Sequence, residues 1–126
     1  MTAPAPAPAA TPPPPYWAVI FTSLRTPGDD GYAQTAAAMV ELGARQPGFL
    51  GIESARGDDG LGITVSYWES LEAIAAWKAV GDHLAAQRAG RSRWYRAFTT
   101  RIARVERETV FAASSTTARA PAADRA

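Results

Sequence analysis

The stretch "FLGIESARGDDGLGITVSYW", residues 49–68, predicts a β-hairpin and decides the fold. Residues 49–56 and 61–68 are rich in apolar, β-branched and aromatic side chains, as strands are. The Gly-Asp-Asp-Gly sequence between them, residues 57–60, is a strong hairpin turn signal. Two strands joined by so short a turn pair antiparallel, so the other elements must be arranged around an antiparallel hairpin.

A strand and a helix are predicted before the hairpin. "YWAVIFTSLR", residues 16–25, reads as a strand that stops at Thr26-Pro27-Gly28. Asp29 or Asp30 then caps a helix that runs to about residue 45, before the Gln-Pro-Gly at 46–48. Its apolar residues recur at helical spacing, at Tyr32, Ala36, Met39, Val40 and Gly43.

A helix and a strand are predicted after the hairpin. Ser70 caps a helix that carries Leu71, Ile74, Ala75 and Trp77, pauses near Gly81-Asp82 and resumes to about residue 95. A last strand with an irregularity covers residues 98–111. The order β-α-β-β-α-β predicts an α+β fold, a ferredoxin-like sandwich with helices on one face of an antiparallel sheet.

The sheet is apolar on both faces. Residues 16–25 place Val19 and Phe21 on one face and Ala18 and Ile20 on the other, and residues 61–68 are mixed in the same way. Since the chain has no helices left to cover the second face, we expect a second copy to pack on it sheet to sheet. The sequence therefore predicts a homodimer.

Both ends of the chain differ in composition from the middle. Residues 1–15 contain only Met, Thr, Ala and Pro, and they lack the basic start and leucine-rich stretch of a secretion signal. Residues 112–126 are small, polar and alanine-rich. We expect both ends to be disordered, solvated tails around one domain at residues 16–111.

Composition excludes several classes of site. The absence of cysteine excludes disulfides, thiolate catalysis and zinc-thiolate sites, and one histidine excludes a metal site built on several imidazoles of one chain. No run is long enough to span a membrane, and the lack of cysteine suits the cytoplasm. The basic residues between 88 and 107 accompany no recognition motif, so we expect a solvated surface and no nucleic-acid partner.

Two segments carry a family resemblance. "QPGFLGIES" (46–54) and "ITVSYWESLEAIAAW" (63–77) resemble the antibiotic biosynthesis monooxygenase (ABM) family, whose members are dimeric α/β barrels of ferredoxin-like protomers. The resemblance extends over residues 16–108. It is greatest to a bacterial branch whose pattern is present here as Tyr67, Trp68, Glu69, Ser70, Trp77, Lys78, His83, Gln87, Gly90, Trp94 and Tyr95.

The resemblance implies site residues. Cofactor-free members oxidise electron-rich phenols with dioxygen and use an asparagine and a tryptophan on the third strand, where this chain has Thr64 and Trp68. Haem-degrading members have a helix tryptophan at the position of Trp77 and a ligating histidine at that of Gln87. The chain contains no asparagine, so neither set of residues is complete in it.

A second group of candidates comes from helical spacing. His83, Gln87, Gly90 and Trp94 fall within about 60° of one another on a helix, which predicts one stripe with an imidazole, an amide, a gap and an indole. Such a mix suits a small-molecule pocket. His83 is the one neutral-pH base in the chain, and the hypothesis is that it deprotonates or hydrogen-bonds a phenolic substrate.

Three functions stay open on sequence alone. The first is a cofactor-free oxygenase of a small aromatic or quinol-type molecule, with His83 and Trp68 as catalytic residues and Thr64, Trp77, Gln87 and Trp94 lining the pocket. The second is a protein that binds haem or a hydrophobic metabolite without turnover, with haem as the alternative to no cofactor. The third is an assembly module that joins larger complexes.

Overall fold

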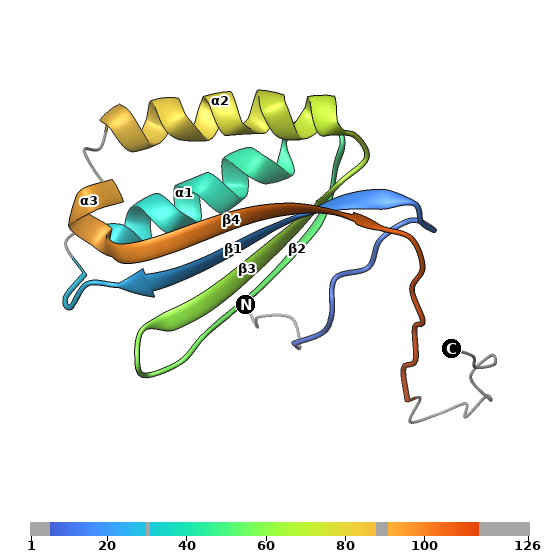
Figure 1. Ribbon diagram of the computed structural model, residues 1–126, viewed down its shortest axis with the longest axis horizontal. Coiled ribbons are helices and arrows are strands. Elements are labelled where there is room, and N and C mark those ends of the chain that lie inside the picture. Colours follow the sequence, from blue (N-terminus) through green and yellow to red (C-terminus); the bar gives the residue numbers. More distant parts are fainter. Residues whose placement is uncertain (1–5, 30, 88–90, 114–126) are drawn as a thin grey trace, which may run out of the picture.

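The computed structural model describes residues 6–29, 31–87 and 91–113, and the side chains at 84–87 and 91–92 fall outside that description. The elements follow the expected order with one short helix added (Figure 1). Their bounds are β1 Tyr16–Arg25, α1 Tyr32–Ala44, β2 Phe49–Arg56, β3 Leu61–Trp68, α2 Leu71–Gln87, α3 Arg91–Trp94 and β4 Tyr95–Val105.

The four strands form one antiparallel sheet in the order β2-β3-β1-β4. β1 lies between β3 and β4, and the predicted hairpin forms the other half of the sheet. Both long helices lie on the same face of the sheet, as Figure 1 shows. The ferredoxin-like βαββαβ fold is therefore confirmed.

Side-chain hydrogen bonds begin both long helices where the sequence predicts. The Asp29 carboxylate accepts the backbone N–H groups of Gly31 and Ala33, each at 3.0 Å, ahead of α1. Ser70 Oγ accepts the N–H of Ala73 at 3.0 Å in the first turn of α2. Each oxygen satisfies donors that the helix cannot pair internally. The other candidate cap of α1, residue 30, lies outside the described residues.

The predicted pause at Gly81-Asp82 is wrong, because α2 runs unbroken from Leu71 to Gln87. Gly81 is instead a point of close helix packing, where an added Cβ would lie 3.2 Å from Cε of Met39 on α1. The contact with α1 compensates for the weak helix propensity of glycine. Among the described residues, no helix combines the length and apolar character needed to cross a bilayer.

The last strand begins and ends earlier than predicted. β4 covers Tyr95–Val105 rather than 98–111, because its pairing with β1 starts at Arg25↔Tyr95 and finishes at Tyr16↔Val105. The expected irregularity is present as a register shift between Leu24 and Arg25. Residues 91–94 form the short helix α3 immediately before the strand, where the sequence predicts a continuing helix.

The register of the sheet settles which side chains face the helices. Val19 pairs with Ser66 and Phe21 with Thr64, and all four line the space beneath α1 and α2. Since side chains alternate along a strand, Trp68 points to the same, helix-covered side. The intervening residues of β1 and β3 form the outer face of the sheet.

The outer face is partly covered by the N-terminal segment. Composition predicts a solvated tail at 1–15, but the described part, residues 6–15, crosses beneath the sheet in Figure 1. The N–H of Ala9 donates to Glu53 Oε2 at 2.8 Å, and the Thr11 hydroxyl donates to that of Tyr16 at 3.0 Å. At Gly51 an added Cβ would lie only 3.3 Å from Cβ of Ala9. Extended Ala/Pro chain lies flat, and its alanine N–H groups still donate hydrogen bonds.

The far end of the outer face is open. Leu61 and Ile63 on β3 are 49% and 46% exposed. These are the residues that a second copy packed sheet to sheet would bury. The homodimer stays a prediction.

Gly48, between α1 and β2, is expected to tolerate substitution much less than Gly28. Both residues have positive φ, 85° and 79°, which costs an L-residue about 1–2 kcal/mol. An added Cβ at Gly48 would lie 2.6 Å from Cβ of Ala73, whereas Gly28 has no atom within 4 Å of that position. We predict that Gly48→Ala lowers the free energy of unfolding by about 1–3 kcal/mol more than Gly28→Ala does. Urea unfolding of the two variants measures the difference, and equal losses would contradict the packing of α2 on this turn.

Glu53 should make stability depend on pH. The Tyr67 hydroxyl and then the Ala9 N–H lower its pKa below the ordinary value of 4.5, and burial only partly opposes them. The stability from this carboxylate is present above that ordinary value and is lost as pH falls through the lowered folded pKa. We predict a shallower loss of unfolding free energy below about pH 5 in Glu53→Gln than in the parent chain.

Urea midpoints at a series of pH values test this prediction. Glu41→Gln, which removes an exposed carboxylate on α1, controls for net charge. Identical pH profiles for Glu53→Gln and the parent chain would contradict the hydrogen bonds that Tyr67 and Ala9 donate to Glu53.

Candidate functional site

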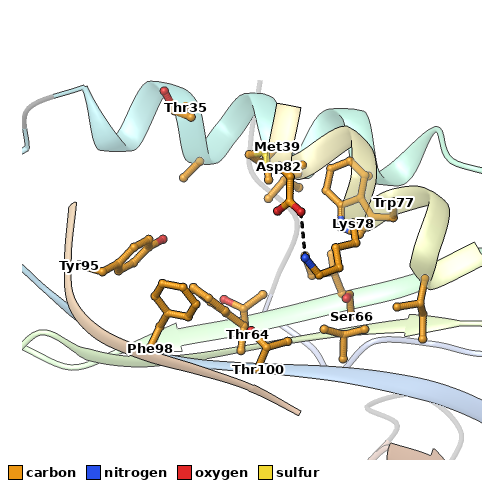
Figure 2. Close-up of a pocket in the computed structure, with 18 of the residues that line it drawn as sticks. Thr35, Met39, Thr64, Ser66, Trp77, Lys78, Asp82, Tyr95, Phe98 and Thr100 are labelled. Carbon is orange, nitrogen blue, oxygen red and sulfur yellow. Dashed lines mark hydrogen bonds and ion pairs between the residues drawn. The ribbon is translucent and has the colours of Figure 1, made fainter. Parts of the chain in front are cut away.

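A cavity of about 440 Å³ lies between the helix-covered face of the sheet and helices α1 and α2. Figure 2 shows side chains from both layers pointing into it, with Thr64, Ser66 and Thr100 on the sheet and Met39 and Trp77 on the helices. A volume of this size is within the range of small-molecule sites. Most of the lining is apolar or aromatic, so the few polar groups define how a ligand would be oriented.

Stacked indoles form one end of the cavity. Trp68 is fully buried, and its ring stacks on Trp77 with centroids 6.2 Å apart and 22° between planes. The ring of Phe49 meets Trp68 edge-on at 5.4 Å. Trp68 Nε1 donates to Ser66 Oγ at 2.8 Å, which satisfies the buried N–H. An added Cβ at Gly43 would lie 3.4 Å from the Trp77 ring, so a small residue on α1 admits that indole.

The other end combines tyrosines with an arginine. Tyr95 lies against Tyr32 with ring centroids 5.9 Å apart, and against Phe21 at 5.4 Å. Arg56, at the end of β2, also lines the cavity and donates from Nη2 to Ser23 Oγ at 2.7 Å. This end therefore carries a positive charge beside aromatic rings.

The Tyr95 hydroxyl stays protonated at neutral pH. Burial is the main cause that raises its pKa, and a hydrogen bond with Tyr32 raises it further. The positive charges of Arg56 and Arg25 oppose the rise without cancelling it. A neutral phenol of this kind donates a hydrogen bond but supplies no base.

Lys78 and Asp82 on α2 complete the polar lining. Lys78 Nζ and Asp82 Oδ2 are 2.8 Å apart, the interaction dashed in Figure 2. Both side chains are substantially exposed, which places them at the opening of the cavity. In the part of the chain that the structure describes, no cluster of three histidine, cysteine or acidic side chains could hold a metal ion.

Four predicted site residues meet at this cavity. Thr64, Trp68, Trp77 and Trp94 all line it, although they come from β3, α2 and α3. Thr64, at the position of the family's asparagine, shares a 2.7 Å hydrogen bond with Ser54 on β2.

The two remaining candidates are not placed in the cavity. His83 is exposed and is absent from the cavity lining. Because α2 is continuous, His83 lies about 180° around the helix from Ile74, which faces inward. The predicted inward-facing stripe that begins at His83 assumed that a new helix starts after the pause at Gly81-Asp82. The side chain of Gln87 and the whole of residue 90 lie outside the described residues.

Sequence reasoning missed Arg56 and Tyr95 as site residues. Alternation along β2 was a usable signal, since Ile52 and Arg56 are four residues apart and both line the cavity. That signal becomes decisive only once the helix-covered face of β2 is known. Tyr95 was hidden because the predicted helix ran through it.

Ser66 should matter to stability more than Ser54 does. Ser66→Ala leaves the buried Trp68 N–H without its acceptor, which costs about 1–3 kcal/mol. Ser54→Ala removes an exposed hydroxyl pair with Thr64 and is expected to cost about 1 kcal/mol or less. Chemical unfolding followed by tryptophan fluorescence compares the two variants. Equal costs would argue against the bond between Ser66 and the indole.

Comparison with known proteins is consistent across the domain. The uncharacterized protein YqjZ of Bacillus subtilis (strain 168) is 54% identical over 101 residues, which cover 80% of this chain and 89% of that protein. SnoaB of Streptomyces nogalater, described as a cofactor-independent oxygenase, superposes with a TM-score of 0.57 at 14% identity, over 77% of this chain and 97% of that one. Rv0793 of Mycobacterium tuberculosis superposes with a TM-score of 0.60 at 19% identity, over 75% of this chain and 99% of that one. These two likenesses show the shared fold. The profile of the antibiotic biosynthesis monooxygenase family matches residues 15–89, so the chain belongs to the ABM family.

Proposed function

We propose that the protein binds a small aromatic phenol or quinol-type molecule in this cavity and oxidises it with dioxygen, without a bound metal or flavin. The observation that carries the proposal is the cavity itself, roofed by α1 and α2 and lined by aromatic rings at both ends. Flat rings stack favourably on indoles and phenyl groups, so the lining selects a planar ligand.

The chemistry balances without an external reductant. In the oxidation of 1-naphthol to naphthoquinone, the substrate supplies four electrons, one oxygen atom becomes the new carbonyl, and the other leaves as water. The protein's part is to hold the ring, exclude bulk water and favour the phenolate, which reacts with dioxygen more readily than the phenol. SnoaB, which shares the fold, is described as a cofactor-independent oxygenase, which supports this chemistry.

The residues of this chain narrow how the phenolate could form. The proposal assigns no proton transfer to His83, since that side chain is exposed outside the cavity. Trp77 acts by holding the aromatic ring, and the fully buried Trp68 supports Trp77 through the stack of the two indoles. Thr64 offers a hydroxyl where other family members have a carboxamide.

Binding without turnover is the second candidate, and one observation favours it. Several polar groups of the cavity already engage one another, in the pairs Trp68–Ser66 and Lys78–Asp82. No imidazole is found among the described lining residues, so a haem held here would have to use Met39 or a tyrosine as its ligand. The candidate is therefore a binder of hydrophobic metabolites, with haem less well matched.

Oxygen uptake with 1-naphthol tests the proposed function. We expect the EDTA-treated protein to consume dioxygen and form naphthoquinone. Trp77→Ala removes the ring wall and should lower kcat/KM about tenfold, since aromatic pairs and buried rings contribute on the order of 1–2 kcal/mol. His83→Ala changes an exposed residue about 120° around the same helix from Trp77 and outside the cavity lining, so it should retain the parent activity.

The outcomes separate the candidates. Quenching of tryptophan fluorescence by 1-naphthol without oxygen uptake would leave the binding protein as the function. Loss of turnover in His83→Ala would return that residue to the role of base. If 1-naphthol causes neither fluorescence quenching nor oxygen uptake, the proposal is refuted.

A further inference from the structure

Arg56 presents a free pair of donors at the rim of the cavity. Its Nη1 donates to the carbonyl oxygens of Ser23, at 3.1 Å, and Gly60, and its Nη2 donates to Ser23 Oγ at 2.7 Å. A guanidinium has five N–H groups, so these bonds leave the Nε–H and one Nη2–H. In the described part of the chain, no carboxylate forms an ion pair with Arg56.

The backbone beneath this guanidinium is shaped to receive it. Gly62 on β3 pairs with Arg56 on one side and with Ser23 on the other. A Cβ at Gly62 would lie 2.6 Å from Cζ and 2.8 Å from Nη1 of Arg56. The guanidinium therefore lies flat on bare backbone, and Ser23, which is only 2% exposed, fixes its orientation. Such fixed geometry is what bidentate recognition of an anion requires.

Aromatic rings flank the same end of the cavity. Phe98 on β4 pairs with Ser23 on β1. The centroid of its ring lies 5.4 Å from that of Phe21 and 5.9 Å from that of Tyr95. All three rings line the cavity together with Arg56. A ligand seated here meets rings and a guanidinium at once.

The charge around this end is positive. Arg25 lies over the ring of Tyr32, with Cζ 3.6 Å from the centroid, and it too forms no carboxylate pair among the described residues. The nearby Asp59 of the hairpin turn points its Oδ1 to the N–H of Leu61 at 3.0 Å. Two cations without a paired anion favour a negatively charged ligand group.

We propose that Arg56 forms an anion subsite, through which the cavity selects aromatic molecules that carry a carboxylate. The inference rests on the proposed function and narrows its substrate class to aromatic acids. The acidic group binds the free Nε–H and Nη2–H at the rim, and the rings extend inward past Phe21. The protonated Tyr95 hydroxyl adds a neutral donor at the same end.

Two matched probes, anthracene-2-carboxylate and the neutral anthracene-2-carboxamide, test the subsite by quenching of tryptophan fluorescence. We expect the parent chain to prefer the carboxylate. Arg56→Gln should weaken carboxylate binding about tenfold, the size of a charge-assisted hydrogen bond, while carboxamide binding changes by less than about twofold. Arg45→Gln removes an exposed arginine outside the cavity and should alter neither.

A second variant keeps the charge and moves the guanidinium. Gly62→Ala places a methyl group where Arg56 now lies, and the flexible arginine end can shift, so the fold should persist. We expect this variant also to lose the preference for the carboxylate.

Each outcome bears on one proposal. Equal binding of both probes by the parent chain, or parallel changes for both probes in Arg56→Gln and Gly62→Ala, would overturn the subsite and leave the aromatic pocket standing. If neither probe binds, the subsite is overturned, and oxygen uptake with 1-naphthol decides the proposed function separately. Selective loss of carboxylate binding supports the subsite whether or not the protein turns over 1-naphthol.

Discussion

The stack between Trp68 of β3 and Trp77 of α2 sets the distance between the helical layer and the sheet. Two large rings in an offset stack lie between α2 and the strands, and the hydrogen bond to Ser66 fixes the Trp68 ring. On the other side of the stack, glycines at positions 43 and 81 let α1 approach α2. The helices thus pack closely on each other while the sheet stays apart from them, and the cavity occupies the space that remains.

The cavity is chemically different at its two ends. Trp68 marks the end with the stacked indoles, and Gly62 marks the end with Arg56. The two residues are six positions apart on β3, roughly 20 Å along the strand. At the Trp68 end the polar atoms are paired with one another, so that end offers ring contacts alone. At the Gly62 end Arg56 retains unused donors. A ligand that is apolar at one end and acidic at the other has one favourable direction of entry, and this orientation matters for an oxidation that must occur at a particular ring carbon.

The fold was predictable because each of its signals is local. The turn at 57–60 fixes the hairpin, and Ser70 marks the start of α2 without reference to any other part of the chain. The site depends on contacts between distant segments. At Gly81, where α2 continues without a break, the helix packs closely against Met39 of α1, forty-two positions earlier in the sequence. Because α2 is continuous, His83 points away from the cavity. Likewise, Arg56 becomes a site residue only through its alignment across the sheet, which its spacing in the sequence does not specify.

The outer face of the sheet is divided by the same kind of distant contact. At one end, Glu53 accepts hydrogen bonds from Tyr67 and from Ala9 of the N-terminal segment, so the chain covers itself there. At the other end, Leu61 and Ile63 stay exposed. A second copy packed on the exposed end leaves the segment in place. Contact over the whole face requires residues 6–15 to move off and leaves Glu53 without one of its donors, which costs free energy unless the partner replaces it. A predicted dimer that used the whole outer face would therefore compete with the N-terminal segment for Glu53, whereas one that used only the exposed end would not.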